Sequence, residues 1–313
     1  MSDLSKDKYI IVNYHYVEDP RPKSAGISPC SIAEFDRQIS YLSKNFKIVN
    51  LGEIYQAAVS GKEGKFCAIT FDDGLKDNYV NAFPILQKYQ ATATFFIITS
   101  VFEHRLPAAH KIHILLSRFT ADQIIDLFHT FIGEFYPDLK NQYIIPKDRR
   151  LTERRMHEGV AMANFKETMI ALPEDVRSQF LRYGFKINKL NEEKISSHLF
   201  LNREEIKALL DGGMQIGSHS HGHYSMSGDD ESFLRKDVKL SKEILSGIIG
   251  AYPKWFSYPH GRSSAVAERV LREEGFDLAV TIQRKKIEST DSPLTIPRYD
   301  TIDIKEYLDE QKI

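Results

Sequence analysis

Two adjacent carboxylates stand where an apolar stretch of the sequence ends. Asp72 and Asp73 follow the run FCAITF and precede Gly74. Successive strand residues point to opposite sides, but a turn at the glycine would let both carboxylates approach one centre. Neighbouring carboxylates are costly in a buried place unless they meet a cation. The same text also suits an ordinary polar turn, so this motif alone leaves both interpretations open.

Three histidines occur within five residues of a second motif. His219, His221 and His223 follow the short apolar stretch MQIGS. Imidazole nitrogens are common metal ligands, and His219 and His223 would share a face on one helical turn. By composition alone His221 could belong to the same set, and a solvated histidine-rich loop is the alternative.

A third motif contains Tyr258, Pro259, His260 and Gly261, again after an apolar run. Such a Pro-His-Gly sequence can form a rigid loop that exposes one backbone N–H, although Pro259 has none to donate. In α/β barrels the carboxyl ends of the strands gather at one face. The three motifs would therefore converge, and two histidines with one carboxylate form a known catalytic metal set with open positions.

The elements needed to position these motifs are visible as short, nearly continuous apolar or β-branched runs, which are typical of strands buried on both faces. The expected strands are Tyr9–Tyr14, Phe46–Leu51, Phe66–Phe71, Thr92–Ile98, Met214–Ser218, Lys254–Tyr258, Leu278–Ile282 and Leu294–Pro297. Helical patterns fall between them at Ser31–Lys44, Asn78–Tyr89, Asn202–Asp211, Asp230–Gly247 and Ser263–Glu274. This alternation predicts an α/β barrel or a doubly wound sheet.

Two of the expected helices carry local signals of their own. Ser31 followed by Glu34 predicts a capping box, and Pro84 predicts a kink or boundary within Asn78–Tyr89.

Residues 102–198 differ from the rest, because they show helical periodicity and much charge but no convincing strand. We interpret them as a mostly helical insertion within a single domain that spans residues 1–313.

The composition of the chain limits its partners and its location. The chain has 42 basic and 43 acidic residues, so bulk electrostatics give no reason to expect a nucleic-acid partner. The two cysteines indicate no disulfide framework. Since no apolar stretch suits a signal peptide or a membrane span, we expect a cytoplasmic protein.

The order TFDDG, SHSHGH, FSYPHG resembles the polysaccharide deacetylases, also called the NodB-homology family. The resemblance covers about Tyr9–Leu51, Lys65–Thr99 and Asn202–Arg298 and leaves the insertion outside. It implies a distorted, incomplete α/β barrel of about seven strands. It also implies a hydrolase that removes an N-acyl group from an amino sugar.

The resemblance implies a role for each motif. Asp73, His219 and His223 would hold a divalent metal, zinc by ligand type, and Asp72 would be the base. His221 falls on a variable position and is not expected to be a ligand. The backbone N–H of His260 would help to hold the oxyanion, and Tyr258, Pro259 and Gly261 would line the substrate.

Two departures from the family pattern concern the catalytic groups. Ser257 stands near the place where many members have an arginine that orients the base, and Arg298 is a possible substitute. A surface arginine paired with Asp300 is the alternative. The late family motif with a general-acid histidine has no histidine here. His260 is then the first candidate for the proton donor and His15 the second. A structural role for His15, with its side chain bonded to a neighbouring carbonyl, is the alternative.

The class of substrate can be inferred only indirectly, from the insertion and the expected location. An insertion near the site and a cytoplasmic location favour a small or activated N-acyl amino sugar. Trp255, Tyr258 or Tyr299 could stack on its ring, although for Trp255 core packing is the first expectation. One alternative is an amide or imide hydrolase with a non-sugar substrate, since a fold does not settle a substrate. Another is a catalytically inactive glycan-binding protein. The sequence carries no signal for the oligomeric state.

Overall fold

The computed structural model describes residues 4–20, 27–153, 156 and 158–311. Its described residues divide into two compact units. One, here called the barrel unit, lies within residues 1–19, 29–105 and 196–313. The other, the helical unit, lies within residues 20–28 and 106–195. The single-domain interpretation of residues 1–313 stays a prediction, and its first three and last two residues lie outside the described part.

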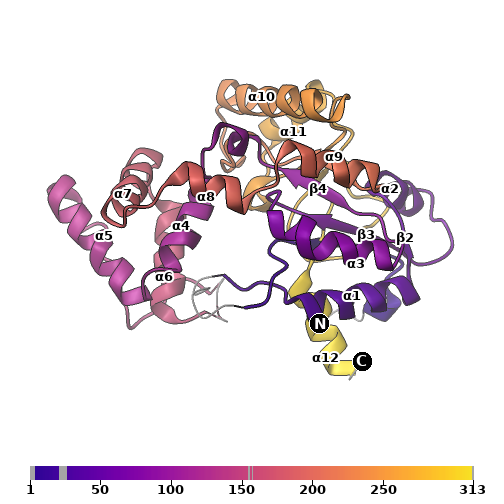
Figure 1. Cartoon of the computed structure of the whole chain (residues 1–313), viewed down its shortest axis with the longest axis horizontal. Coiled ribbons are helices and arrows are strands. Elements are labelled where there is room, and N and C mark those ends of the chain that lie inside the picture. Colours follow the sequence, from indigo (N-terminus) through magenta and orange to yellow (C-terminus); the bar gives the residue numbers. More distant parts are fainter. Residues whose placement is uncertain (1–3, 21–26, 154–155, 157, 312–313) are drawn as a thin grey trace. The chain divides into compact units, whose positions relative to one another are not determined.

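A parallel sheet forms the centre of the barrel unit (Figure 1). Its strands run in the order β7-β6-β5-β4-β3-β1-β8, with β2 beside β3, and every pairing between them is parallel. The seven strands of this path curl into a half-barrel, which confirms the predicted fold class. The strands are β1 (Tyr9–Tyr14), β2 (Lys47–Ile48), β3 (Phe66–Phe71), β4 (Thr94–Ile97), β5 (Gln215–Ser218), β6 (Trp255–Ser257), β7 (Leu278–Val280) and β8 (Tyr299–Asp300).

The last predicted strand is placed wrongly. Instead of a strand at Leu294–Pro297, the structure has one isolated bridge between Ile296 and Val280, and β8 begins only at Tyr299. Pro297 has no N–H to donate, so the ladder cannot continue through it. Residues 294–300, here called the closing segment, thus pair first with β7 and then with β1.

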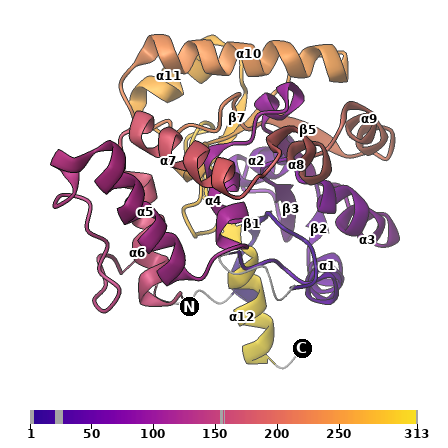
Figure 2. The same cartoon turned by 60° about the vertical axis from the view of Figure 1, so that its left-hand side comes forward.

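The helical unit contains helices and no strand among its described residues, as predicted for the insertion (Figure 2). Helix α4 packs against α5 and α7, and α5 packs against α6 and α7. Phe128 and Phe131 of α5 pack against Phe180 of α7, with ring centroids 5.1 Å apart for Phe128 and Phe180. The helices are α4 (Ala108–Leu116), α5 (Ala121–Phe135), α6 (Val160–Ala171) and α7 (Glu174–Ile187); α8 (Glu192–Leu199) crosses the boundary of the two units.

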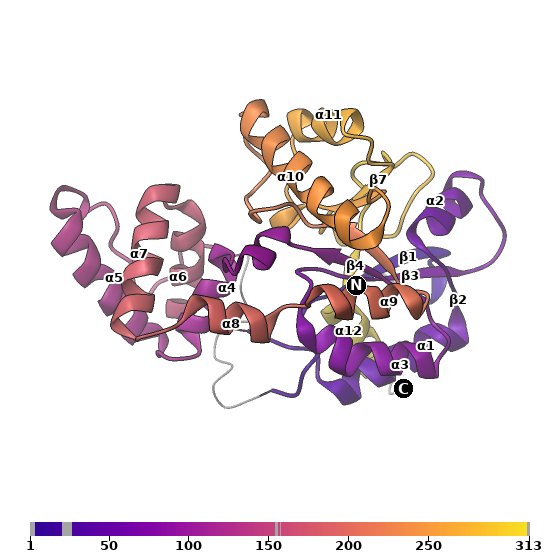
Figure 3. The ribbon, with the colours of Figure 1, turned by 45° about the horizontal axis from the view of Figure 1, so that its top comes forward.

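Helices cover the sheet of the barrel unit. Figures 1 and 3 show α10 and α11 together on one side and α1 and α3 together on the other. The helices of this unit are α1 (Ile32–Asn45), α2 (Leu51–Val59), α3 (Phe83–Lys88), α9 (Arg203–Asp211), α10 (Glu231–Ile249), α11 (Ala265–Glu273) and α12 (Thr301–Gln311). Within the described residues, no helix is long and apolar enough to cross a membrane.

Local signals set several helix starts. The Ser31 hydroxyl accepts the Glu34 N–H, but the Glu34 carboxylate accepts from Gln38 and Arg37, so only half of the predicted capping box forms. The predicted helix Asn78–Tyr89 is interrupted, as expected, near Pro84. It begins with a π-helical turn at Asn78–Ala82, and α3 starts one residue before the proline.

Strand alternation separates two apolar clusters. On β1, Ile10, Val12 and Tyr14 join the cluster that includes α1, whereas Ile11 joins the cluster that includes α2 and Phe96. Because strand residues two apart share a face, Asn13 lies on the same face as Ile11. The same rule applies to β3, where Ala68, Thr70 and the following Asp72 share that face. Polar groups therefore enter the barrel at the carboxyl ends of these strands.

Arg298 of the closing segment crosses to this polar face. Its side chain is buried and forms a two-pronged ion pair with Asp72, with Nη1–Oδ1 and Nη2–Oδ2 distances of 2.9 and 2.7 Å. Its other hydrogen bonds reach Asn13 Oδ1 at 2.8 Å, Thr70 Oγ1 at 3.1 Å, Ser257 Oγ at 3.0 Å and the carbonyl of Thr281 at 2.9 Å. One guanidinium thus links the closing segment to β1, β3, β6 and the residue after β7.

We expect Arg298→Met to lower the free energy of unfolding by about 3–5 kcal/mol, because it leaves the buried Asp72 carboxylate without its cation. Urea unfolding of the metal-free protein measures this. Arg37→Met is the matched control, since its ion pair with Asp309 is partly exposed and should contribute about 1 kcal/mol or less. Asp72→Asn combined with Arg298→Met should cost less than the sum of both single changes. Strict additivity would contradict a direct interaction.

Candidate metal and catalytic site

The two adjacent carboxylates reach one site because the chain turns between them. Asp72 continues the inward face of β3, and Asp73 then adopts a left-handed conformation with φ of 74°. Gly74 follows with φ of 70°, and a Cβ there would lie 3.0 Å from the Ile97 side chain. The turn predicted at the glycine therefore begins one residue earlier, and it cancels the alternation that would have separated the two acids.

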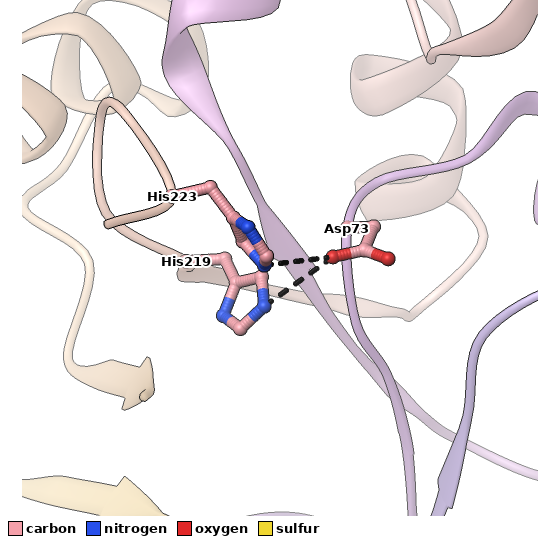
Figure 4. A group of neighbouring side chains, drawn as sticks. All are labelled: Asp73, His219 and His223. Carbon is pink, nitrogen blue, oxygen red and sulfur yellow. Dashed lines mark ion pairs between the residues drawn. The ribbon is translucent and has the colours of Figure 1, made fainter. Parts of the chain in front are cut away.

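Asp73, His219 and His223 form a compact group of metal-ligand type (Figure 4). The Nε2 atoms of both histidines lie 3.4 Å from Asp73 Oδ1, and the ligand atoms of all three residues lie within 4.8 Å of one another. His219 Nδ1 lies 2.7 Å from the carbonyl oxygen of Ser257, which can only accept, so Nδ1 carries the hydrogen. Nε2 then presents a lone pair to the group, and the three residues fit a divalent metal.

The loop between the two histidines is held by polar contacts. The Ser220 hydroxyl accepts the N–H of His223, and both residues have left-handed backbones, with φ of 64° and 56°. Asp237 of α10 accepts the N–H groups of His221 and Gly222 at 3.0 and 2.8 Å. No local pattern marks Asp237 as part of the site, because an acid on a helix face is usually solvated.

His221 lies outside the metal group, as the resemblance implied. Its Nδ1 is 3.0 Å from Thr99 Oγ1, and its Nε2 is 3.0 Å from an Arg105 nitrogen. The middle histidine therefore joins its loop to the residues that follow β4. Its presence in the motif does not make it a ligand.

Asp72 is held in the ionised state. Burial alone would raise its pKa, but the Arg298 guanidinium, aided by His219 and His15, outweighs burial and lowers the pKa to about 2. For His219 the directions are reversed. Burial alone would lower its pKa, but the carboxylates of Asp72 and Asp73 outweigh burial and raise the pKa. The alternative of a surface Arg298 paired with Asp300 is wrong, since Arg298 is 1% exposed and bound to Asp72.

The third motif contributes less than the sequence suggested. The Tyr258 ring is completely buried against Phe256, so the expectation that it stacks on a sugar is wrong. Tyr299 is also buried and donates to Asp7, and it cannot stack either. Trp255 is partly buried and packs against an apolar cluster. Aromatic residues at strand ends have the same sequence pattern whether they face the core or a ligand.

The Pro259–Gly261 turn nevertheless borders the metal group. His260 is exposed, has φ of 58°, and places its ring 4.7 Å from the His223 ring, centroid to centroid. Gly261 has φ of 64°, and a Cβ there would lie 2.1 Å from Ile282, so the turn requires a glycine. Substrate contacts by Pro259 and Gly261, and the oxyanion role of the His260 N–H, stay predictions.

His15 lies beside the carboxylate that the resemblance makes the base. Its Nε2 is 4.0 Å from Asp72 Oδ2, and 42% of its side chain is exposed. An imidazole that faces both solvent and the site is suited to carry a proton between them. The structure thus gathers Asp72, Asp73, His219 and His223, with His15, His260 and Arg298 around them.

A model of the family described as polysaccharide deacetylase matches residues 60–123 and 176–279, more than half of the chain. Two relatives are named poly-beta-1,6-N-acetyl-D-glucosamine N-deacetylase. The one from Staphylococcus epidermidis is 25% identical over 68% of this chain and 72% of its own length. The one from Escherichia coli K12 is 21% identical over 88% of this chain, which spans only 34% of that longer protein.

Solved structures agree on the fold. The deacetylase PplD of Streptococcus pyogenes, in complex with acetate, aligns over 94% of this chain and 92% of its own with a TM-score of 0.59 and 17% identity. IcaB from Ammonifex degensii aligns over 94% and 91% with a TM-score of 0.56 and 18% identity. The family match, together with the converging motifs, leads to one conclusion: this chain belongs to the polysaccharide deacetylase family and is a hydrolase of that family.

Proposed function

We propose that this protein is a metal-dependent N-deacetylase that releases acetate from N-acetylglucosamine units of a glycan. The observation that carries the proposal is the placement of two imidazole Nε2 atoms 3.4 Å from Asp73 Oδ1, next to a second carboxylate held ionised by Arg298. A glycan-binding protein would need no base beside a metal group. The names of the relatives supply the acetyl group and the sugar.

Asp73, His219 and His223 would hold the metal, and zinc is the first choice for two imidazoles and one carboxylate. When bound, such a metal polarises an acyl oxygen and lowers the pKa of water. The protein's own residues then handle the proton. Asp72 accepts it from the attacking water, and its pairing with Arg298 keeps it ready to do so at neutral pH.

The leaving nitrogen needs a proton from another group, because an amine anion is a very poor leaving group. We assign this role to His15, whose Nε2 lies 4.0 Å from Asp72 Oδ2 and whose side chain is partly exposed. The His260 ring lies against the metal-group residue His223 instead, and its backbone is better suited to the oxyanion. His15, the second choice from sequence, thus becomes the first.

The size of the substrate separates two forms of this proposal. The relatives are named for a polymer, whereas the insertion and the expected cytoplasmic location favoured a small or activated sugar. The cytoplasmic location stays a prediction. We favour an oligomeric substrate, because the proposed donor side chain is partly exposed at the site and the family acts on polysaccharides.

Replacing a metal-group histidine should remove metal affinity. In titration calorimetry of metal-free protein with Zn²⁺, His219→Gln and His223→Gln should each weaken binding at least about 100-fold, since even outer partners of ligands contribute about 10–100-fold. His221→Gln is the matched control from the same motif and should keep wild-type affinity. Equal loss in all three variants would contradict the assignment.

Asp72→Asn should keep the metal and lose turnover. General-base catalysis contributes about 10²–10⁴-fold, so kcat for acetate release should fall by that order while the zinc affinity changes little. The measurement is acetate release by zinc-loaded protein. An active Asp72→Asn variant would show that another group takes the proton.

Oligomers should be better substrates than monomers. We expect kcat/KM for amine release from β-1,6-linked N-acetylglucosamine oligomers to exceed that for free N-acetylglucosamine or its UDP-linked form by at least about tenfold, because remote sugar units add binding energy to the transition state. Preference for the UDP-sugar would support the small-substrate form. Hydrolysis of cyclic imides alone would support a non-sugar substrate.

A further inference from the structure

The segment that follows Asp72 and Asp73 forms hydrogen bonds with the backbone of the loop that carries His15. Three polar side chains, Asp77, Asn78 and Asn81, are here called the loop clamp. Asn78 Nδ2 donates to the carbonyl of His15 at 2.7 Å. Asp77 Oδ2 accepts the N–H of Val17 at 2.7 Å, and Asn81 Nδ2 donates to the carbonyl of Val17 at 2.8 Å. The backbone on both sides of Tyr16 is thereby fixed by side chains 60 to 64 residues later in the sequence.

The local backbone explains how these side chains reach one loop. Residues Asn78–Ala82 form a π-helical turn, a rare conformation that is frequent at functional sites. From this turn the Asn78 amide reaches the carbonyl of His15 and the Asn81 amide reaches the carbonyl of Val17, so both side chains contact the same strip of backbone. Asn78 also donates to Asp77 Oδ1 at 3.1 Å, so both oxygens of Asp77 are engaged.

The clamp is costly by itself. Asn78 is completely buried, and burial raises the pKa of Asp77 to about 7 against the opposing hydrogen bonds from Val17 and Asn78. Partial burial of the Asp77 carboxyl costs free energy, which its hydrogen bonds with Val17 and Asn78 offset. The same short segment carries Asp72 at one end and the clamp at the other. The backbone N–H of Asp72 also donates to the carbonyl of Tyr14 at 3.0 Å. One stretch of chain therefore sets the base and the neighbouring histidine together.

We propose that Asp77, Asn78 and Asn81 are positioning residues that hold His15 where its imidazole can protonate the leaving nitrogen. The proposal rests on the proposed function, in which His15 is the proton donor. In that step the C–N bond breaks, its electron pair stays on nitrogen, and the imidazolium proton passes to that nitrogen. The products are acetate and a free amine. A displaced imidazole would leave the base and the metal group intact and would impair only the proton transfer.

This step can be isolated by changing the leaving group. An aryl acetate ester such as 4-nitrophenyl acetate releases a phenolate that needs no proton, whereas an amide releases an amine that does. We expect Asn78→Asp and Asn81→Asp, which keep the shape but remove the donor, to lower kcat/KM for the sugar amide by about tenfold or more. This is part of the about 10²–10⁴-fold contribution of a positioned acid. For the aryl ester, kcat/KM should stay within about twofold of wild type.

Two comparisons sharpen the experiment. Asp77→Asn keeps an acceptor for the Val17 N–H and should retain more amide activity than Asp77→Ala. Asn45→Asp is the matched control, because Asn45 also donates its amide to a backbone carbonyl, that of Tyr41 at 2.8 Å. It should change neither substrate. Zinc affinity and urea unfolding are measured on every variant. Asn81 is less buried than Asn78, so Asn81→Asp gives the result if Asn78→Asp does not fold.

The His15→Gln variant separates two claims, that His15 is the proton donor and that the loop clamp positions it. A selective loss on the amide in both His15→Gln and the clamp variants supports it. A selective loss in His15→Gln with parallel losses on both substrates in the clamp variants overturns the positioning role and leaves the donor assignment in place. An unchanged amide-to-ester ratio in His15→Gln shows that His15 is not the donor, and it overturns the clamp proposal as well.

Discussion

The buried ion pair between Arg298 and Asp72 is the interaction on which the rest of the site depends. Two charges removed from water are costly, and the cost is offset only when their remaining donors and acceptors are satisfied. Here the guanidinium contacts β1, β3, β6 and the residue after β7 as well as Asp72. The arrangement that closes the half-barrel is therefore the same one that keeps the Asp72 carboxylate ionised.

The backbone of the candidate site departs from the local rules that the rest of the sheet follows. Asp73, Ser220, His223 and His260 all have positive φ, although none is a glycine. Such conformations each cost of order 1–3 kcal/mol and persist where the surroundings over-determine them. For His223 the surroundings include Asp237, whose carboxylate accepts the N–H groups of the two residues that precede His223 in the loop. Stability is thus given up locally so that side chains from different strands meet.

Much of this could be predicted from sequence because it follows from short patterns. The strands at Tyr9–Tyr14 and Phe66–Phe71 were predicted to the residue, since apolar side chains fill both of their faces. The convergence of Asp73, His219 and His223 followed from their positions at strand ends. The sequence could not decide whether Arg298 pairs with Asp72 or with Asp300. Pro297 displaces the last strand, and the strand position would have shown to which face the Arg298 side chain points. Asp237 and the buried Tyr258 were missed or misread, since neither long-range contact nor burial leaves a local signal.

Ser257 shows why the family's orienting arginine can come from another part of the chain. Its hydroxyl accepts from Arg298 Nη2 at 3.0 Å, and its carbonyl accepts from His219 Nδ1 at 2.7 Å. The residue is completely buried, so a long side chain at this position would occupy the space now used by the guanidinium. A cation at residue 257 and a cation at residue 298 therefore exclude each other. In this chain Ser257, the last residue of β6, leaves that space open, and Arg298 of the closing segment supplies the guanidinium that pairs with Asp72.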